Sequence, residues 1–493
     1  RYQWKFTSSL RNHIKDTFHQ ETSATSSTES DRVSKLSETF EEYLKNQFDT
    51  NIPIEMLMVN KSSQISKSLF VHKNYNLCPS LKFPLLGDIQ FNNTYWQYLK
   101  TKMGKIIYIY SAYYDNRSIL KNNPVIRILA MSNEVKRSPD FGIFCHIWSK
   151  DKRFVLTTNV SIIRLAPLNY QNCPLRGYLI TCEIPQEIRK QVPTAVSLAE
   201  DPCLKVKNVL RVINNQPEGE TKKDFAVCLK GFDFVNYDIS IYLVEWLELI
   251  SLLGIHKVYL YNLNLHPNMS KVLNYYRNRG LVHVTPLTLA GNVPNIPKLQ
   301  HDFLESKANQ LLHEKIPFHD CFYMNMNRYN YIAVLDIDEI ILPVNAKSWR
   351  ELIKDITKRK NNGLYTNFLF RRNIVLDEMR QTHGYDYSLP SYMYMLQNIY
   401  RSKVSERNPK TIFNTVNTVV FSTHEPRICL GGRCINKRHN VAKASVFHYR
   451  SRCKKKKQAS CNNVEVVNDT RIWNYKDELV QRATATLKLL HLI

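Results

Sequence analysis

The sequence predicts a mixed α/β fold, in which a mainly parallel sheet flanked by helices follows a β-rich region. Three features support this prediction. Strand-like and helix-like segments alternate from residue 224 onward, residues 331–342 form an apolar run, and residues 71–215 contain short β-type runs separated by turn residues. Such alternation favours a parallel sheet with right-handed crossovers, and a short run of β-branched residues is typical of a strand buried on both faces.

The chain divides into four predicted parts. Residues 1–70 are predicted to be a flexible stem, because the segment 21–37 is rich in Ser and Thr and has no apolar period. Residues 224–450 are the alternating domain, and residues 451–493 a basic loop and a C-terminal helix. Between stem and alternating domain we predict a β-rich N-terminal domain over 71–215, with strands near 105–115, 125–131, 141–148 and 177–184.

The elements of the alternating domain follow one another regularly. The stretch 239–255 is the most hydrophobic of the chain, but it contains Glu245 and Glu248 and reaches Gly254, so it predicts a buried helix and not a membrane span. Ser348 and Glu351 fit a capping box that opens a later helix. We predict strands over 224–230, 257–262, 281–287 and 331–342, and a second helix over 268–279.

An acidic cluster ends the apolar run 331–342. Asp336, Asp338 and Glu339 crowd together there and repel one another unless a cation lies among them. Oxygen ligands suit Mn²⁺ or Mg²⁺, and the carboxyl ends of strands in an open α/β sheet are where ligands bind. The cluster therefore predicts a metal–nucleotide site. The competing interpretation is a solvated acidic turn, since a D-x-D arises by chance about once in a chain of this composition.

The net charge of +25 and the pI near 9.5 indicate an anionic partner. The basic residues are dispersed apart from the run 454–457, and no signature of DNA or RNA binding accompanies them, so we predict no nucleic-acid partner. A nucleotide-sugar diphosphate or an anionic membrane surface fits the charge equally well. The sequence contains neither a G-x-G-x-x-G nor a P-loop motif, which disfavours classical dinucleotide-binding proteins and P-loop NTPases.

The 11 cysteines and several N-x-S/T sequons favour the secretory pathway. Because no C-x-x-C occurs, the close pairs Cys429 with Cys434 and Cys453 with Cys461 predict local disulfides and not zinc sites.

Several short motifs in order resemble glycosyltransferase family 92. They are residues 245–249 (EWLEL), 254–262 (GIHKVYLYN), 320–321 (DC), 335–339 (LDIDE) and 448–450 (HYR), and residues 111–117 with 125–127 resemble the N-terminal β module of animal members. The resemblance implies a GT-A-type, Rossmann-like fold and a lumenal domain held at the Golgi membrane by an N-terminal anchor. A segment before Arg1 is expected, since the chain does not begin with Met.

The resemblance also implies an activity. It is that of β-1,4-galactosyltransferases, which use UDP-galactose and Mn²⁺ (or Mg²⁺) on glycan or glycoprotein acceptors, including the core fucose of N-glycans. One residue departs from the family's pattern: the sequence has Met324 at a position where we expect a basic residue. The alternative is a catalytically inactive glycan-binding protein of the secretory pathway.

The same resemblance assigns roles to individual residues. Asp338 is the expected direct metal ligand, Asp336 a ligand through water or a ribose contact, and Glu339 an orienting group. His448 is the expected third ligand, with His424 as its competitor.

Further residues are expected to contact the donor or the acceptor. Arg450 pairs with the pyrophosphate, while Cys228, Lys230 and Asn262 lie where such folds bind the nucleoside. The implied reaction inverts the configuration at the anomeric carbon of the sugar. It needs a carboxylate that takes the proton from the acceptor hydroxyl. We predict Asp377 or Glu378 for that role, with Asp386 and Glu425 as alternatives.

Overall fold

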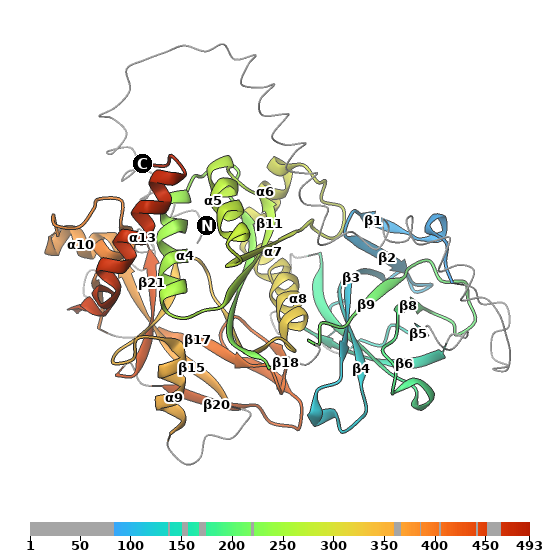
Figure 1. Ribbon diagram of the computed structural model, residues 1–493. Coiled ribbons are helices and arrows are strands. Elements are labelled where there is room, and N and C mark those ends of the chain that lie inside the picture. The colour runs from blue at the N-terminus through green and yellow to red at the C-terminus, as the bar shows by residue number, and fades with distance from the viewer. Residues whose placement is uncertain are drawn as a thin grey trace, which may run out of the picture.

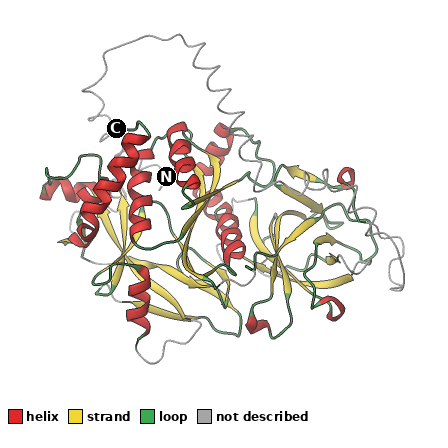
Figure 2. Ribbon diagram, viewed as in Figure 1, coloured by secondary structure: helices red, strands yellow, loops and turns green. Residues whose placement is uncertain are grey.

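The computed structural model contains two large sheets, with most of the helices gathered around the second (Figure 1, Figure 2). It describes residues 83–136, 139–149, 156–166, 174–217, 221–358, 366–384, 386–403, 406–439, 442–450 and 465–493. The predicted stem 1–70, the lysine run 454–457, and the pair Cys453 and Cys461 lie outside these residues.

The first sheet is built from the β-type runs of the N-terminal part. Its strands are antiparallel except for the parallel pair β3–β9, which closes the sheet from β3 round to β9. The order is β1-β2-β3-β4-β7-β6-β5-β8-β9. The bounds are β1 (Phe91–Asn93), β2 (Trp96–Lys100), β3 (Ile106–Asp115), β4 (Val125–Ser132), β5 (Phe144–Trp148), β6 (Leu156–Arg164), β7 (Arg176–Glu183), β8 (Ala195–Ala199) and β9 (Leu210–Ile213), with short 3₁₀ turns η1 (Leu86–Asp88), η2 (Ser118–Leu120) and η3 (Gln186–Ile188).

The second sheet begins with four parallel strands, in the order β12-β11-β10-β13. The chain alternates between these strands and helices, so the predicted mixed α/β fold is confirmed. The elements are β10 (Lys223–Asp233), α4 (Ser240–Leu252), β11 (Lys257–Asn264), α5 (Pro267–Asn278), β12 (Val282–Pro286), α6 (Pro297–Glu305), α7 (Lys307–His313), α8 (Lys315–Asn325) and β13 (Tyr329–Val334).

The remaining strands extend this sheet on the other side of β13, beginning with the antiparallel strand β17. The elements are β14 (Glu339–Pro343), α9 (Trp349–Thr357), β15 (Thr366–Leu376), α10 (Asp377–His383), α11 (Tyr394–Gln397), β16 (Tyr400–Ser402), β17 (Glu406–Asn414), β20 (Ile435–His439), β21 (Ala444–Arg450), β22 (Val466–Asn468), η5 (Thr470–Tyr475) and α13 (Lys476–Leu489). Strands β18 (Thr418–Phe421) and β19 (Pro426–Cys429) form a separate hairpin.

Strand β10 is buried on both faces, as its apolar sequence predicts. Phe225, Val227 and Leu229 belong to the cluster that contains α4, whereas Ala226 and Cys228 belong to the cluster that contains α8. The predicted single strand over 331–342 is wrong in one respect, because the backbone turns at its acidic residues. The amide of Glu339 donates to the carbonyl of Asp336, so β13 ends before the turn and β14 begins after it.

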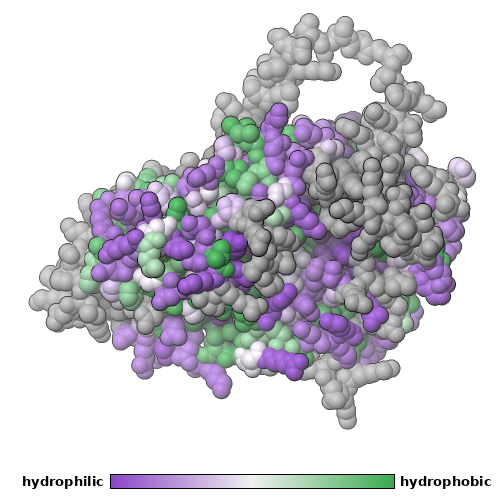
Figure 3. Space-filling view, turned by 180° about the vertical axis from the view of Figure 1, so that it is seen from behind, coloured by the Kyte–Doolittle hydropathy of each residue, from purple (hydrophilic) through white to green (hydrophobic). Residues whose placement is uncertain are grey.

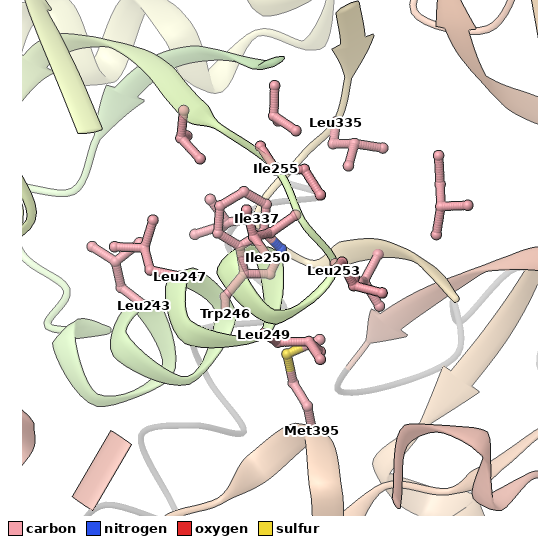
Figure 4. Close-up of a cluster of buried hydrophobic side chains, with 14 of the residues drawn as sticks. Leu243, Trp246, Leu247, Leu249, Ile250, Leu253, Ile255, Leu335, Ile337 and Met395 are labelled. Atoms are coloured by element: carbon pink, nitrogen blue, oxygen red, sulfur yellow. The ribbon is translucent and has the colours of Figure 1, made fainter. Parts of the chain in front are cut away.

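Helix α4 is buried on nearly all sides, which explains its continuous apolar sequence. Figure 4 shows Leu243, Trp246 and Ile250 of this helix among side chains from other elements, including Leu335, Ile337 and Met395. Helices α11 and α13 contact it as well, and α13 lies beside it in Figure 1. The prediction of a buried helix is therefore confirmed, and none of the described helices is both long and apolar enough to cross a membrane.

Glu245 is a buried carboxylate that caps α11. Its oxygens accept hydrogen bonds from the amides of Met395 (2.9 and 3.0 Å) and Leu396 (3.0 Å). Burial raises its pKa to about 7, against the lowering effect of these amides. The Glu245 carboxylate lies inside an apolar helix because it accepts hydrogen bonds from N–H groups at the start of α11, which have no acceptor within that helix.

Removing this cap is expected to destabilise the protein. Glu245→Ala leaves two buried amides without their acceptor, so we expect a loss of about 2–4 kcal/mol in the free energy of unfolding. The measurement is urea denaturation followed by circular dichroism. Glu305→Ala, at an exposed position at the end of α6, is the matched control. An unchanged unfolding free energy in Glu245→Ala would show that the cap contributes nothing.

The two sheets share one core. Helix α8 lies between them (Figure 1), and a single apolar cluster contains Tyr113 and Leu129 of the first sheet together with Tyr261 of the second. Asp320 of α8 accepts hydrogen bonds from Ser111 (2.6 Å) and Tyr113 (2.5 Å) of β3 and from Tyr261 (2.7 Å) of β11. The division into domains at residues 215 and 224 remains a prediction, but the two parts are packed as one body.

Three disulfides lie within the described residues. Cys429–Cys434 confirms the local pairing that their spacing predicted. Cys182 of β7 pairs with Cys145 of β5, although β6 lies between these two strands in the sheet, and Cys228 of β10 pairs with Cys321 of α8. The opposite face of the molecule, seen in Figure 3, carries many hydrophilic side chains among smaller apolar areas.

Candidate functional site

The acidic turn between β13 and β14 lies at the carboxyl end of the parallel strands. Strand β21 pairs with β14 so that His448 stands opposite Glu339, and the amide of Tyr449 donates to the carbonyl of Asp338 (2.8 Å). This pairing brings the H-Y-R segment against the D-I-D-E segment, although more than a hundred residues separate them.

Asp338 and His448 form a close pair in this site. Nε2 of His448 lies 3.1 Å from Oδ2 of Asp338, and Nε of Arg450 donates to the same imidazole nitrogen (3.2 Å). Burial and the neighbouring Asp336 carboxylate raise the pKa of Asp338 to about 6. Because both causes disfavour the charged carboxylate, the site stabilises Asp338 most when a cation is close to it.

The other two carboxylates are engaged by fixed cations. Asp336 lies 2.8 Å from Nζ of Lys230 and 3.3 Å from Nζ of Lys410. Glu339 lies 2.5 Å from the same Lys410 nitrogen and 3.4 Å from Arg372. Burial alone would raise the pKa of Asp336, but the two ammonium groups hold it well below its usual value. Asp336 is therefore a fixed anion between two lysines.

A pocket of about 210 Å³ surrounds these groups. Its polar lining comes from β10, the end of α7, the acidic turn, β17 and β21, so both halves of the second sheet contribute. The lining residues used below are Lys230, Phe234, Lys307, Gln310, Glu314, Asp336, Asp338, Arg372, Lys410, His424, His448 and Arg450.

A second, more apolar pocket adjoins the first. Lys230, Phe234, Gln310 and Glu314 line both, while Tyr237 and several leucines line only the second. Its polar end carries Asp233, whose Oδ2 lies 2.7 Å from Nδ1 of His301. Burial raises the pKa of Asp233 despite this contact. The two pockets are therefore neighbours, one mainly apolar and the other mainly charged.

The structure brings many of the predicted donor and metal residues together, but not all. Lys230, Asp336, Asp338, His448, Arg450 and the competitor His424 line the charged pocket. The lining of neither pocket includes Cys228 or Asn262. The assignment of Cys228 needs correction, because its sulfur is bonded to Cys321 and its side chain is fully buried in the α8 core. Asn262 lies in the parallel ladder, where its carbonyl accepts from Leu287.

The predicted catalytic carboxylates lie outside the pocket. Asp377 is buried at the start of α10, where it accepts a hydrogen bond from the hydroxyl of Tyr394, and Glu378 follows it in the same turn. Asp386 caps a local turn at Ser388, and Glu425 lies 3.7 Å from Arg438. None of the four is among the residues that line either pocket.

Sequence reasoning missed several residues that line the charged pocket, among them Arg372, Lys410, Gln310 and Glu314. Lys410 and Arg372 come from β17 and β15, and Gln310 and Glu314 from the region of α7 and α8. Their sequence surroundings resemble those of ordinary basic and polar residues. Only the register of β17 beside β13 and β15 reveals that Lys410 faces the acidic turn.

The site fits a divalent cation through two of its side chains. Within the described part of the chain, no three His, Cys, Asp or Glu side chains converge as a metal-holding group. The 3.1 Å between Asp338 Oδ2 and His448 Nε2 is, however, the spacing of adjacent ligands on an octahedral ion, since bonds of about 2.1 Å at right angles place ligands about 3 Å apart. Ligation through Nε2 would require the Arg450 N–H, which donates to that atom at 3.2 Å, to move away from it. Ions of this kind commonly keep water and substrate phosphates as their other ligands.

This architecture defines a class of protein. Neighbouring apolar and charged pockets at the carboxyl ends of parallel strands are typical of α/β enzymes that bind nucleotides. The chain belongs to glycosyltransferase family 92, whose model matches residues 223–483. The match begins at β10 and reaches α13, so it includes every residue that lines the two pockets.

Two further comparisons add little. A solved structure described as the apo form of the WbbM bifunctional glycosyltransferase is similar over 43% of this chain and 36% of that chain, with 11% sequence identity. The TM-score is 0.18, so this likeness supports no argument about the fold or the site. The search of curated proteins found no match.

Proposed function

We propose that this glycosyltransferase moves galactose from UDP-galactose to a hydroxyl of a glycan or glycoprotein acceptor, with inversion and with help from Mn²⁺ or Mg²⁺. The observation that supports it most is the pair of Asp338 and His448 beside Lys230 and Arg450 in one pocket. The β-1,4 linkage, the core-fucose acceptor, the GT-A-type assignment of the second sheet and the Golgi lumen as location belong to the same proposal. They rest on the resemblance of the motifs.

The shape of the site suggests how the donor lies. The nucleoside occupies the apolar pocket, where Phe234 and Tyr237 offer aromatic surface and Asp233 offers a hydrogen-bond acceptor. The diphosphate then extends toward Lys230 and Arg450, which line the charged pocket. Opposite charges thus meet at the phosphates, and the apolar part of the ligand is removed from water.

The chain's own residues assist the departure of UDP. Negative charge grows on the diphosphate as the glycosidic bond breaks, and the cations of Lys230 and Arg450 stabilise that charge without moving a proton. Asp338 and His448 would hold the divalent ion, which acts as a Lewis acid on the same phosphates. Asp336 keeps Lys230 charged, since its carboxylate raises the lysine pKa against the effect of burial.

Glu314 lines both pockets, whereas the predicted bases Asp377 and Glu378 line neither. It is held by Lys315, whose ammonium group donates to it (2.7 Å). Its charge also raises the pKa of Lys230, so Glu314 lies on the diphosphate side of the donor and not on the opposite face, where the base of an inverting transfer must lie. The choice of Asp377 or Glu378 as the base stays a prediction.

A thermal-shift screen of nucleotide sugars tests this proposal. Because ligand binding to the native state raises its stability, UDP-galactose with Mn²⁺ is expected to raise the melting temperature by roughly 2–5 °C at saturating concentration. GDP-mannose with Mn²⁺ serves as the control ligand, and transfer to an acceptor glycan is measured in parallel. A glycan-induced shift with no response to any UDP-sugar would support the inactive glycan-binding alternative instead.

A further inference from the structure

Lys410 is a buried cation in direct contact with the acidic turn. Its ammonium nitrogen lies 2.5 Å from Glu339 and 3.3 Å from Asp336, and its side chain is only 1% exposed. Lys230 engages the other oxygen of Asp336 at 2.8 Å. A metal ion that approached these two carboxylates would meet ammonium groups already in place.

The charged groups of the site carry no net negative charge without a metal. The carboxylates of the acidic turn and of Glu314 face the cationic groups of Lys230, Lys307, Arg372, Lys410 and Arg450. The net field therefore does not attract a free divalent cation, whereas it does attract a diphosphate. His448 contacts two of the three carboxylates: its Nε2 lies 3.1 Å from Asp338, at a distance that a shared ion fits, and its Nδ1 lies 3.7 Å from Glu339, which Lys410 and Arg372 already hold.

We propose that Lys410 is a built-in counter-ion that confines the metal to Asp338 and His448, so that the metal binds together with the donor nucleotide and only weakly before it. The inference rests on the function proposed above and adds a positioning residue to it. Two protein ligands leave the remaining positions on the ion to phosphate oxygens and water. By linkage, the nucleotide strengthens metal binding by the same factor as the metal strengthens nucleotide binding.

The wild-type protein gives the first test. Free Mn²⁺ is measured by electron paramagnetic resonance during titration, with and without saturating UDP. We expect UDP to tighten Mn²⁺ binding at least about 10-fold. Equally tight binding without UDP would overturn the role of Lys410 while leaving the proposed transferase intact. Mn²⁺ binding in neither condition would contradict the proposed transferase itself, and the role of Lys410 with it.

The variant Lys410→Met gives the second test, in which a gain of binding is expected. Removing the ammonium group leaves Asp336 paired with Lys230 alone and Glu339 with Arg372 as its remaining basic partner, and it removes one positive charge, so Mn²⁺ without UDP should bind about 10-fold more tightly. A merely structural role predicts weaker binding or none. The matched control is Lys403→Met, an exposed lysine paired with Glu465, which should leave the affinity unchanged.

An isosteric pair of variants covers the case in which Lys410→Met does not fold. With UDP present, Asp338→Asn should weaken Mn²⁺ binding about 100-fold, as expected for loss of a ligand, while Asp336→Asn should weaken it less than about 5-fold. Equal losses in the two variants would make Asp336 a ligand and would overturn the proposal. Both measurements report on metal binding directly and do not depend on turnover.

Discussion

Replacing Asp338 with Asn is expected to lower kcat/KM for UDP-galactose at least about 1000-fold, which corresponds to about 4 kcal/mol of transition-state stabilisation. The substitution keeps the size of the side chain but removes the charge that faces His448 at 3.1 Å. In the proposed mechanism Asp338 would be one of the two protein ligands of the divalent ion, so the variant would leave the growing charge on UDP to Lys230 and Arg450. The measurement is steady-state release of UDP with an acceptor glycan and Mn²⁺.

Two controls make the result specific. Asp355→Asn removes a carboxylate whose side chain is 49% exposed and pairs with Lys443 outside the pocket, so its activity should match that of the wild type. EDTA should reduce the wild type to the level of Asp338→Asn and should leave that variant unchanged. Full turnover by Asp338→Asn, or turnover that resists EDTA, would contradict metal-assisted transfer at this site.

The sequence predicted those parts of the fold and site that depend on local pattern. The apolar runs of β10, β11 and β12 and the longer apolar run of α4 can be recognised in the sequence, and strand–helix alternation orders them. The acidic turn and the H-Y-R segment are recognisable because charged side chains directly adjoin buried strands. For the same reason, the sequence alone singles out Asp336, Asp338 and His448, which the structure brings together in one pocket.

The rest depends on contacts between distant segments, which no local pattern encodes. Lys410 faces the acidic turn because β17 enters the sheet next to β13, and Cys228 is closed off because α8 places Cys321 beside it. Asp377 follows an apolar strand as Asp336 does, but it lies in a helix that turns it toward Tyr394. Position at a strand end thus pointed correctly to the pocket for Asp336 and His448 but not for Asn262 or Asp377.

Asp320 is the residue whose loss should affect stability most. It is fully buried, and burial raises its pKa while hydroxyl groups from two sheets oppose that rise. Asp320→Ala leaves the hydroxyls of Ser111, Tyr113 and Tyr261 without their acceptor. At about 1–2 kcal/mol for each buried donor, the expected loss in the free energy of unfolding is about 3–6 kcal/mol.

The same variant tests whether the two sheets unfold as one body. If the shared core couples them, urea transitions followed by tryptophan fluorescence and by far-ultraviolet circular dichroism coincide in the wild type and move together in Asp320→Ala. Asp302→Ala, at an exposed position on α6, should leave both transitions in place. Two separate transitions in the wild type would show that the N-terminal sheet is an independent domain. A single shifted transition instead makes that sheet part of the transferase fold, since it then stabilises α8 and the site residues at the start of that helix.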